Sequence, residues 1–442
     1  MYKPLIILWS LLAIWELNAQ TSLPEYIEKG LSQNSGFQQA SLVTSAAAAA
    51  QQAATAQGSI RLDFQPSYTV AAGGRTIDIP IGDIVNPVYS TLNTLTGSEQ
   101  FPQLDNVSEL LNPNNFYDVK VRATYPVLNK AIGINEDIKT LQTELARDGE
   151  ELARQRLVAD ISVAYYDCQM ALRAIDVYRD AQVLIQENIR VNRSLVKRGA
   201  GLPTSVLAAE SDSVLVAAEL VNAQLRAEAA AARLNVLTNQ SMTAPVAKDE
   251  TITTLPRMAA SINAARPELA QLNRLLAINQ KQVELAQSGG KPQLNVFADV
   301  GAQGFDFQID GQAPYVLAGV SLNLNLFDGG QRKASVQEAQ LRQAATEAQR
   351  TYLVQQLSLE AFAAWQTCTA SINTYTALTT DVNIKQRQYQ DQLGRYRAGT
   401  VNYIAVQEAR NAWTQAQLAQ NIAFFQTWKD WVMWERAAGA EG

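Results

Sequence analysis

Histidine is absent from the 442 residues of the chain, and cysteine occurs only twice. The lack of histidine removes the commonest general base and the commonest transition-metal ligand, so Ser-His-Asp and Cys-His catalytic arrangements are excluded. The CxxC, HExxH, Walker A and GxGxxG patterns are also missing. The glycine pairs Gly289-Gly290 and Gly329-Gly330 stand alone at expected strand and helix boundaries, where turns need them. We therefore expect neither an enzyme nor a bound metal or cofactor.

Strong positive charge and long apolar runs are lacking as well. The formal net charge is −6, and no basic patch of the kind that nucleic acids require is visible. The apolar run Leu5 to Trp15 is too short for a membrane-spanning helix, which needs about 20 residues. Because Lys3 precedes this run and Leu17-Asn18-Ala19 follows it, we expect a secretory signal peptide at residues 1–19, with an uncleaved anchor as the alternative.

What the chain does contain is an internal repeat at a spacing of about 200 residues. Ala164-Tyr165-Tyr166-Asp167-Cys168 is echoed by Ala363-Ala364-Trp365-Gln366-Thr367-Cys368. We expect a first repeat at 20–240, a linker at 241–262 and a second repeat at 263–442. Each repeat begins with a helix. The elements expected after it are a hairpin at about 60–127, a long helix at about 130–197 and a return helix at about 204–239 in the first repeat, and a hairpin at about 292–326, a long helix at about 331–397 and a return helix at about 403–435 in the second.

The hairpins are predicted from alternation of apolar and polar residues, which Phe297 interrupts on the polar face of the third strand. Alternation runs through Leu62 to Ala72, Tyr117 to Tyr125, Leu294 to Val300 and Val316 to Leu326. This pattern indicates strands with two different faces. The polar stretch between the first two strands is the longer of the two hairpin loops.

The long helices are predicted from apolar residues in steps of three and four and from missing proline. No proline occurs between Lys130 and Lys197. The spacing indicates coiled-coil packing, and about 68 residues at about 1.5 Å each give a rod on the order of 100 Å. Each rod ends at a glycine, Gly199 or Gly399, as helices prefer.

The two cysteines, Cys168 and Cys368, occupy nearly matching places in the two long helices. A disulfide is permitted outside the cytoplasm if the two Cα atoms lie within about 7 Å. The alternative is a pair of small side chains packed in a helical seam.

The alternating segments also fit a membrane. Each has about ten residues, the length of a tilted transmembrane strand. An open sheet edge is not viable in hydrocarbon, and four strands cannot close because the smallest membrane barrels have about eight. We therefore expect several copies to share one barrel; the alternative is a water-soluble four-stranded sheet on a core. Tyrosines near the strand ends form an interfacial girdle or reflect ordinary strand propensity: Tyr68, Tyr117, Tyr125 and Tyr315.

Three short motifs lie between these elements, one at the turn in each repeat and one at a step from strand to helix. They are Tyr396-Arg397-Ala398-Gly399-Thr400 with Val406 and Ala409, the stretch from Gly199 to Ala209, and Leu326-Phe327-Asp328-Gly329-Gly330. The first two are similar to the second-repeat and first-repeat signatures of the TolC-like outer-membrane efflux proteins, or outer-membrane factors. The third is typical of that family's step from strand to helix. The resemblance covers essentially all of the mature length.

This resemblance implies an α+β membrane protein that assembles as a homotrimer. Four strands per chain would form one 12-stranded barrel in outer-membrane lipid, and long antiparallel coiled-coil helices would form a periplasmic α-barrel. Its far end would be narrowed near Gly199 and Gly399 and would dock on a periplasmic adaptor bound to an inner-membrane transporter.

In the family, a tyrosine and acidic rings at the tip help to close the entrance. Tyr396 matches the tyrosine, whereas two acidic positions are here Ala405 and Glu408, so one ring is lost and one kept. Glu408 faces the pore or is an ordinary solvated charge. Arg397 and Lys197 pair with acids of neighbouring chains or are surface charges without consequence. The candidate gate comprises Tyr396, Arg397, Gly399, Glu408, Lys197 and Gly199.

Three functions are compatible with these features. The first is the outer-membrane duct of a tripartite efflux system for small molecules or drugs. The second is the outer-membrane outlet of a type I protein secretion system. The third is a periplasmic coiled-coil scaffold without a pore.

Overall fold

A computed structural model describes residues 22–257, 266–308 and 311–439. The expected signal peptide at 1–19 lies outside the described residues, as do positions 258–262 of the expected linker and 263–265 of the second repeat. Residue contacts divide the chain into two compact units. A sheet unit comprises Ala49–Thr140 and Asn279–Leu341, and a helical unit comprises the remainder. Each unit draws residues from both predicted repeats.

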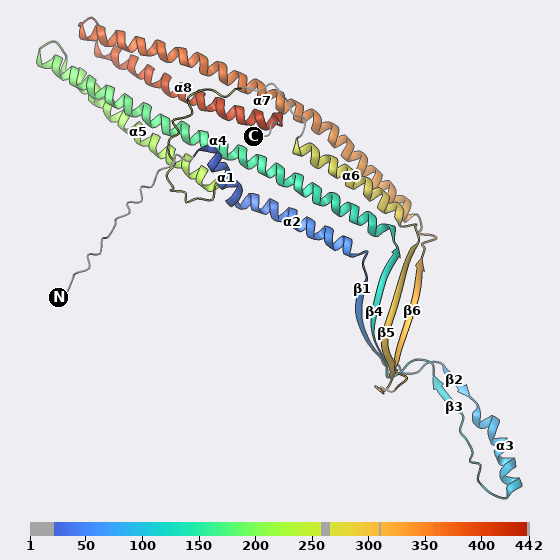
Figure 1. Ribbon diagram of the computed structural model, residues 1–442. Helices are drawn as coiled ribbons and strands as arrows, with labels where there is room; N and C mark the ends of the chain where they lie inside the picture. The colour runs from blue at the N-terminus through green and yellow to red at the C-terminus, as the bar shows by residue number, and fades with distance from the viewer. Residues whose placement is uncertain (1–21, 258–265, 309–310, 440–442) are drawn as a thin grey trace, which may run out of the picture. The chain divides into compact units, whose positions relative to one another are not determined.

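The helices lie at or near the predicted positions (Figure 1). The two longest, α4 and α7, have the bounds expected from their periodicity. Two shorter helices, α5 and α8, follow the turns at Gly199 and Gly399. The bounds are α1 Leu23–Gln33, α2 Ser35–Ala56, α4 Lys130–Lys197, α5 Pro203–Leu237, α6 Pro267–Ser288, α7 Gln331–Arg397 and α8 Tyr403–Ala438.

The helix expected at the start of the first repeat is interrupted at Asn34, between α1 and α2. The Asn34 backbone is extended there, with φ −68° and ψ 121°. Its side-chain oxygen accepts a hydrogen bond from the Phe37 amide at 3.0 Å, and its side-chain nitrogen donates to the Leu237 carbonyl at 2.9 Å. The asparagine thus caps α2 and fastens the break to the end of α5, a long-range contact that periodicity cannot reveal.

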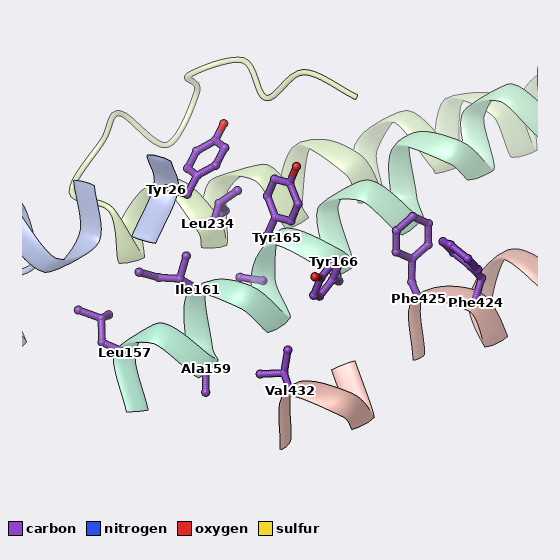
Figure 2. Close-up of a cluster of buried hydrophobic side chains, with 11 residues drawn as sticks. Tyr26, Leu157, Ala159, Ile161, Tyr165, Tyr166, Leu234, Phe424, Phe425 and Val432 are labelled. Carbon is purple, nitrogen blue, oxygen red and sulfur yellow. The ribbon is translucent and has the colours of Figure 1, made fainter. Parts of the chain in front are cut away.

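The core of the helical unit is a cluster of large aromatic and aliphatic side chains (Figure 2). Tyr165 of α4 and Phe425 of α8 are fully buried in it. The Tyr165 hydroxyl donates to the Asp249 carboxylate at 2.6 Å, so the linker is held against α4. The cluster comprises Tyr26, Leu157, Ala159, Ile161, Ala164, Tyr165, Tyr166, Leu234, Phe424, Phe425 and Val432.

Both cysteines are free and buried, Cys168 in α4 and Cys368 in α7. Burial raises the pKa of the Cys168 thiol to about 12 and that of Cys368 to about 11. They are therefore packed thiols, and no disulfide joins them.

The sheet unit contains four antiparallel strands in the order β1-β4-β5-β6. Both predicted hairpins are present, and β4 pairs with β5, so strands from the two halves form one sheet. The last strand ends at Asn323 and not at the predicted position 326. Their bounds are β1 Arg61–Thr69, β4 Phe116–Leu128, β5 Gln293–Phe305 and β6 Pro314–Asn323.

The polar stretch between β1 and β4 is more than the loop that the sequence predicted. It contains β2 (Thr76–Ile79), α3 (Ile81–Thr96) and β3 (Val107–Leu110), and β2 pairs with β3. Turn-forming residues concealed the helix, because Asn86-Pro87 lies inside α3.

The strand register gives the sheet two chemically distinct faces. Phe64, Val121, Val300 and Val316 form one row across all four strands. On the opposite face, Asp63, Arg122 and Asp299 form the neighbouring row. Within residues 22–257, 266–308 and 311–439, no helix combines the length and apolar character needed to cross a membrane.

Candidate functional site

The turns that end α4 and α7 have the same backbone geometry. Gly199 and Gly399 adopt positive φ values of 70° and 77°, which favour glycine because it lacks a Cβ atom. The Ala200 amide donates to the Leu195 carbonyl at 2.9 Å, and the Thr400 amide donates to the Arg395 carbonyl at 3.0 Å. These bonds satisfy carbonyl groups that each helix end would otherwise leave unpaired.

Tyr396, the predicted gate tyrosine, connects α7 to both α4 and α5. It is buried, and its hydroxyl donates to the Asn192 side-chain oxygen at 2.6 Å. Asn192, fully buried on α4, donates in turn to the Ser205 carbonyl of α5 at 3.0 Å. Burial raises the pKa of the Tyr396 hydroxyl, which therefore remains a neutral hydrogen-bond donor.

Close to Tyr403, α5 and α8 are joined by a buried ion pair that was not predicted from the sequence. Arg410 of α8 donates to the Asp212 carboxylate of α5, and both side chains are almost completely buried. The ring of Tyr403 lies 5.6 Å from that of Tyr396. Burial raises the pKa of Tyr403 to about 12, against the opposing influence of the nearby Arg410 charge. No local signal reveals this pair, because its partners are 198 residues apart in the sequence.

The remaining predicted gate side chains lie at the surface of this single chain. Lys197, Arg397 and Glu408 are exposed. Among the described residues, none of the three forms a salt bridge within the chain. The structure thus brings Tyr396 together with Asn192 and places the three charged candidates at the surface of the chain.

On the polar face of the sheet, charged side chains are paired with one another. Arg122 donates two hydrogen bonds of 2.7 Å to the Asp299 carboxylate. Asp118 accepts from Lys120 at 2.6 Å and from the Tyr315 hydroxyl at 2.7 Å. These bonds offset charges on a face that the sequence predicted only as polar.

A cavity of about 200 Å³ lies in the helical unit between α1, α4 and α8. Its lining includes Leu23, Val158 and Trp431 together with Glu435. Burial raises the pKa of Glu435 from its usual 4.5 to about 7. Nowhere in the described part of the chain do three or more metal-ligating side chains cluster as a metal site requires.

Comparison with known proteins identifies the sequence pattern of one family. Residues 259–430 match the family described as outer membrane efflux protein. No curated protein sequence matches the chain.

Solved structures resemble the chain over nearly its whole length. The outer-membrane channel OprN has 19% identity and a TM-score of 0.76, covering 95% of this chain and 90% of its own. The outer membrane protein VceC from Vibrio cholerae has 18% identity and a TM-score of 0.75, covering 94% and 96%. The CmeC outer membrane channel of Campylobacter jejuni has 16% identity and a TM-score of 0.75, covering 95% and 87%. At these identities the likeness shows a shared fold.

The family match also bears on two predictions made from the sequence. It confirms a transport protein and not an enzyme, and it confirms a location in the outer membrane. The predicted resemblance to the TolC-like outer-membrane efflux proteins is thereby confirmed, because residues 259–430 carry this family's sequence pattern on the fold of outer-membrane channels.

Proposed function

We propose that three copies of the chain form the outer-membrane duct of a tripartite efflux system. The duct conducts small molecules passively to the exterior, and an inner-membrane pump delivers them through a periplasmic adaptor. The observation that carries this proposal is the row of apolar side chains exposed on one face of the sheet. Phe64 is 68% exposed and Val316 is 77% exposed, whereas the Asp299 side chain on the opposite face is 1% exposed.

The distribution of side chains supports lipid on the apolar face and water on the other. Exposed apolar patches of this kind mark contact surfaces, because burying them away from water is favourable by about 25 cal/mol per Å². The strands contain 9 to 13 residues, long enough for tilted strands in a bilayer. In this proposal the acyl chains of the lipid cover the apolar face of the sheet, so no helix or loop of the described chain has to pack against it.

The open sheet edges support assembly. Within the described chain, β1 and β6 each pair on one side only. In hydrocarbon their unpaired N–H and C=O groups require partners. A β1–β6 pairing between neighbouring copies supplies them, and three copies give twelve strands, which exceeds the minimum of about eight for a closed barrel.

We further propose that the ends of α4, α5, α7 and α8 form the periplasmic entrance. The gate residues are Tyr396, Arg397, Gly399, Glu408, Lys197 and Gly199. The Tyr396–Asn192 hydrogen bond keeps α7 against α4, and the exposed charged side chains meet the neighbouring copies. Matching turns at Gly199 and Gly399 support the two-repeat organisation that belongs to the same proposal.

Conductance in planar bilayers tests the duct. Purified protein is expected to give discrete conductance steps, and Tyr396→Ala is expected to enlarge them, because it removes the hydroxyl that joins α7 to α4. A membrane that stays electrically silent with both the native protein and Tyr396→Ala would overturn the proposal. No observation favours the secretion outlet or the scaffold over the efflux duct.

A further inference from the structure

The connection between β1 and β4, residues 70–115, folds into a small structure that we call the extension (Figure 1). The ribbon of β2 and β3 leads from the sheet strands into α3, and a return segment, residues 97–106, leads back. The equivalent connection between β5 and β6 comprises only residues 306–313. Of the two connections, the first therefore carries a feature that the duct itself does not require.

One face of α3 is fastened to the return segment. The Asn86 side chain donates to the Leu104 carbonyl at 2.8 Å and accepts from the Leu104 amide at 2.7 Å. Asn93, seven residues further on, makes the same two bonds with Phe101, at 2.7 and 3.0 Å. Gly82 permits the close approach, because a Cβ atom there would lie 2.4 Å from the Leu104 carbonyl oxygen. The orientation of α3 is thus fixed by contacts within the extension.

The opposite face of α3 has no contact with the return segment of this kind and is apolar apart from Thr91, whose hydroxyl donates to the Pro87 carbonyl within the helix at 2.8 Å. If Asn86 and Asn93 are assigned to heptad position f, the a and d positions of α3 fall on five residues that are spaced alternately three and four apart. We call this series the α3 seam, and its members are Ile81, Ile84, Val88, Thr91 and Leu95. All five are exposed, with Ile84 at 66% and Leu95 at 76%. The seam carries no charge.

We propose that the α3 seams of three copies pack together as a parallel three-helix bundle at the outer end of the channel. This inference rests on the proposed trimer, which brings three identical extensions around one axis. The first heptad of the seam has Ile at both positions, Ile81 at a and Ile84 at d, a combination that favours assemblies of more than two helices. The extension is also continuous with β1, the edge strand that pairs with the neighbouring copy in the proposed barrel.

Charge argues against a lipid surface as the occupant of the seam. The extension contains one basic residue, Arg75, against acidic residues at Asp78, Asp83, Glu99, Asp105 and Glu109. Anionic membrane surfaces attract basic segments and repel acidic ones. The seam itself is uncharged, so equal copies meet there without direct repulsion. A helix of 16 residues is also marginal alone in water and gains stability from packing an apolar face.

Disulfide formation between copies tests the bundle in the full-length protein. Val88→Cys places a thiol in the seam, and Ser90→Cys places one on α3 away from the seam. The native Cys168 and Cys368 are buried and serve as an unreactive background. On oxidation of the detergent-purified trimer with copper phenanthroline, Val88→Cys is expected to yield covalent dimers. Because one disulfide joins two chains, at most two of the three chains around a threefold axis can be cross-linked, so the fraction of chains in covalent dimers is at most about two thirds. Ser90→Cys is expected to stay at the background level of cross-linking.

Unboiled gels of the same samples separate the outcomes. A trimeric band whose chains are linked through Val88→Cys supports the bundle. A trimer with equal linking of the two variants, or linking only between separate trimers, overturns it and leaves the duct intact. The absence of any trimer overturns the duct and the bundle together. If Val88→Cys fails to assemble, Leu95→Cys provides the same test one heptad later.

Discussion

In the sheet unit large apolar side chains lie at the surface, whereas in the helical unit they lie inside. Phe64 and Val316 are mostly exposed on the sheet, and Arg122 pairs with Asp299 on the other face. In the helical unit, Tyr165 and Phe425 are fully buried, and most charged side chains remain at the surface. Both units obey the same preference for apolar surroundings, and the proposed duct explains the difference by the solvent that each unit meets, lipid for the sheet and water for the helices.

An apolar side chain that is exposed in a single chain is therefore not necessarily exposed to water in the assembled protein. A water-soluble sheet would cover the row from Phe64 to Val316 with part of the same chain. The sheet instead leaves the row open and pairs charges on the face that the proposal assigns to water. Each side of the contrast can be tested, beginning with the variant that is expected to abolish assembly.

The strongest test compares neighbouring residues on the two faces of β6. Val316→Arg places a charge on the apolar face, where the cost at the middle of a bilayer is about 2–4 kcal/mol per copy. Leu317→Arg places the same charge on the other face, opposite Asp299 in the strand register. We expect Val316→Arg to lose the outer-membrane trimer and Leu317→Arg to retain it, as measured by membrane fractionation and unboiled gels. Equal behaviour of the two variants would remove the distinction between the faces.

Inside the helical unit, the Asp212–Arg410 pair tests how strongly buried charges depend on each other. Asp212→Asn leaves the Arg410 guanidinium buried without its carboxylate, and breaking such a pair costs about 3–5 kcal/mol. Glu210→Gln, two residues earlier on α5, breaks an exposed pair with Arg193 and should cost less than about 1 kcal/mol. Thermal unfolding of the purified protein measures both. Similar melting temperatures for the two variants would contradict the buried arrangement.

A smaller effect is expected at the gate. Tyr396→Phe removes the hydroxyl that donates to Asn192, at a cost of about 1 kcal/mol, and should increase single-channel conductance. Tyr389→Phe removes a weaker contact of 3.4 Å to Asn188 on the same two helices and serves as the control. If Tyr389→Phe raises the conductance as much as Tyr396→Phe does, the gate assignment is wrong.

The smallest effect concerns Glu435 in the cavity between α1, α4 and α8. Its folded-state pKa of about 7 exceeds the usual 4.5, so the folded protein disfavours the charged form. The resulting destabilisation is absent below pH 4.5, grows as the pH rises and is complete above 7. Because the side chain is only partly buried, we expect Glu435→Gln to stabilise the protein by no more than about 1 kcal/mol at pH 8, and not at pH 4. Thermal melts at both pH values check this, with exposed Glu228→Gln as the control; a gain that is equal at the two pH values would contradict it.

Much of the architecture is accessible from the sequence because its signals are local. Alternation located the strands, and the proline-free periodic stretches located α4 and α7. Local signals failed where a distant contact decides the structure. The break at Asn34 depends on the Leu237 carbonyl, and α3 depends on asparagine side chains that bind the return segment.

The candidate gate was predictable only in part for the same reason. The glycine turns and Tyr396 are recognisable from short motifs. Asn192, Asp212 and Arg410 are not, because they lie in the middle of helical sequence and meet partners about 200 residues away only in the folded chain.

The mass of the complex extracted from outer membranes tests the central claim most directly. The apolar sheet face and the open edges of β1 and β6 predict a detergent-dependent particle of three chains. A single folded chain released into aqueous extract without detergent would contradict the account.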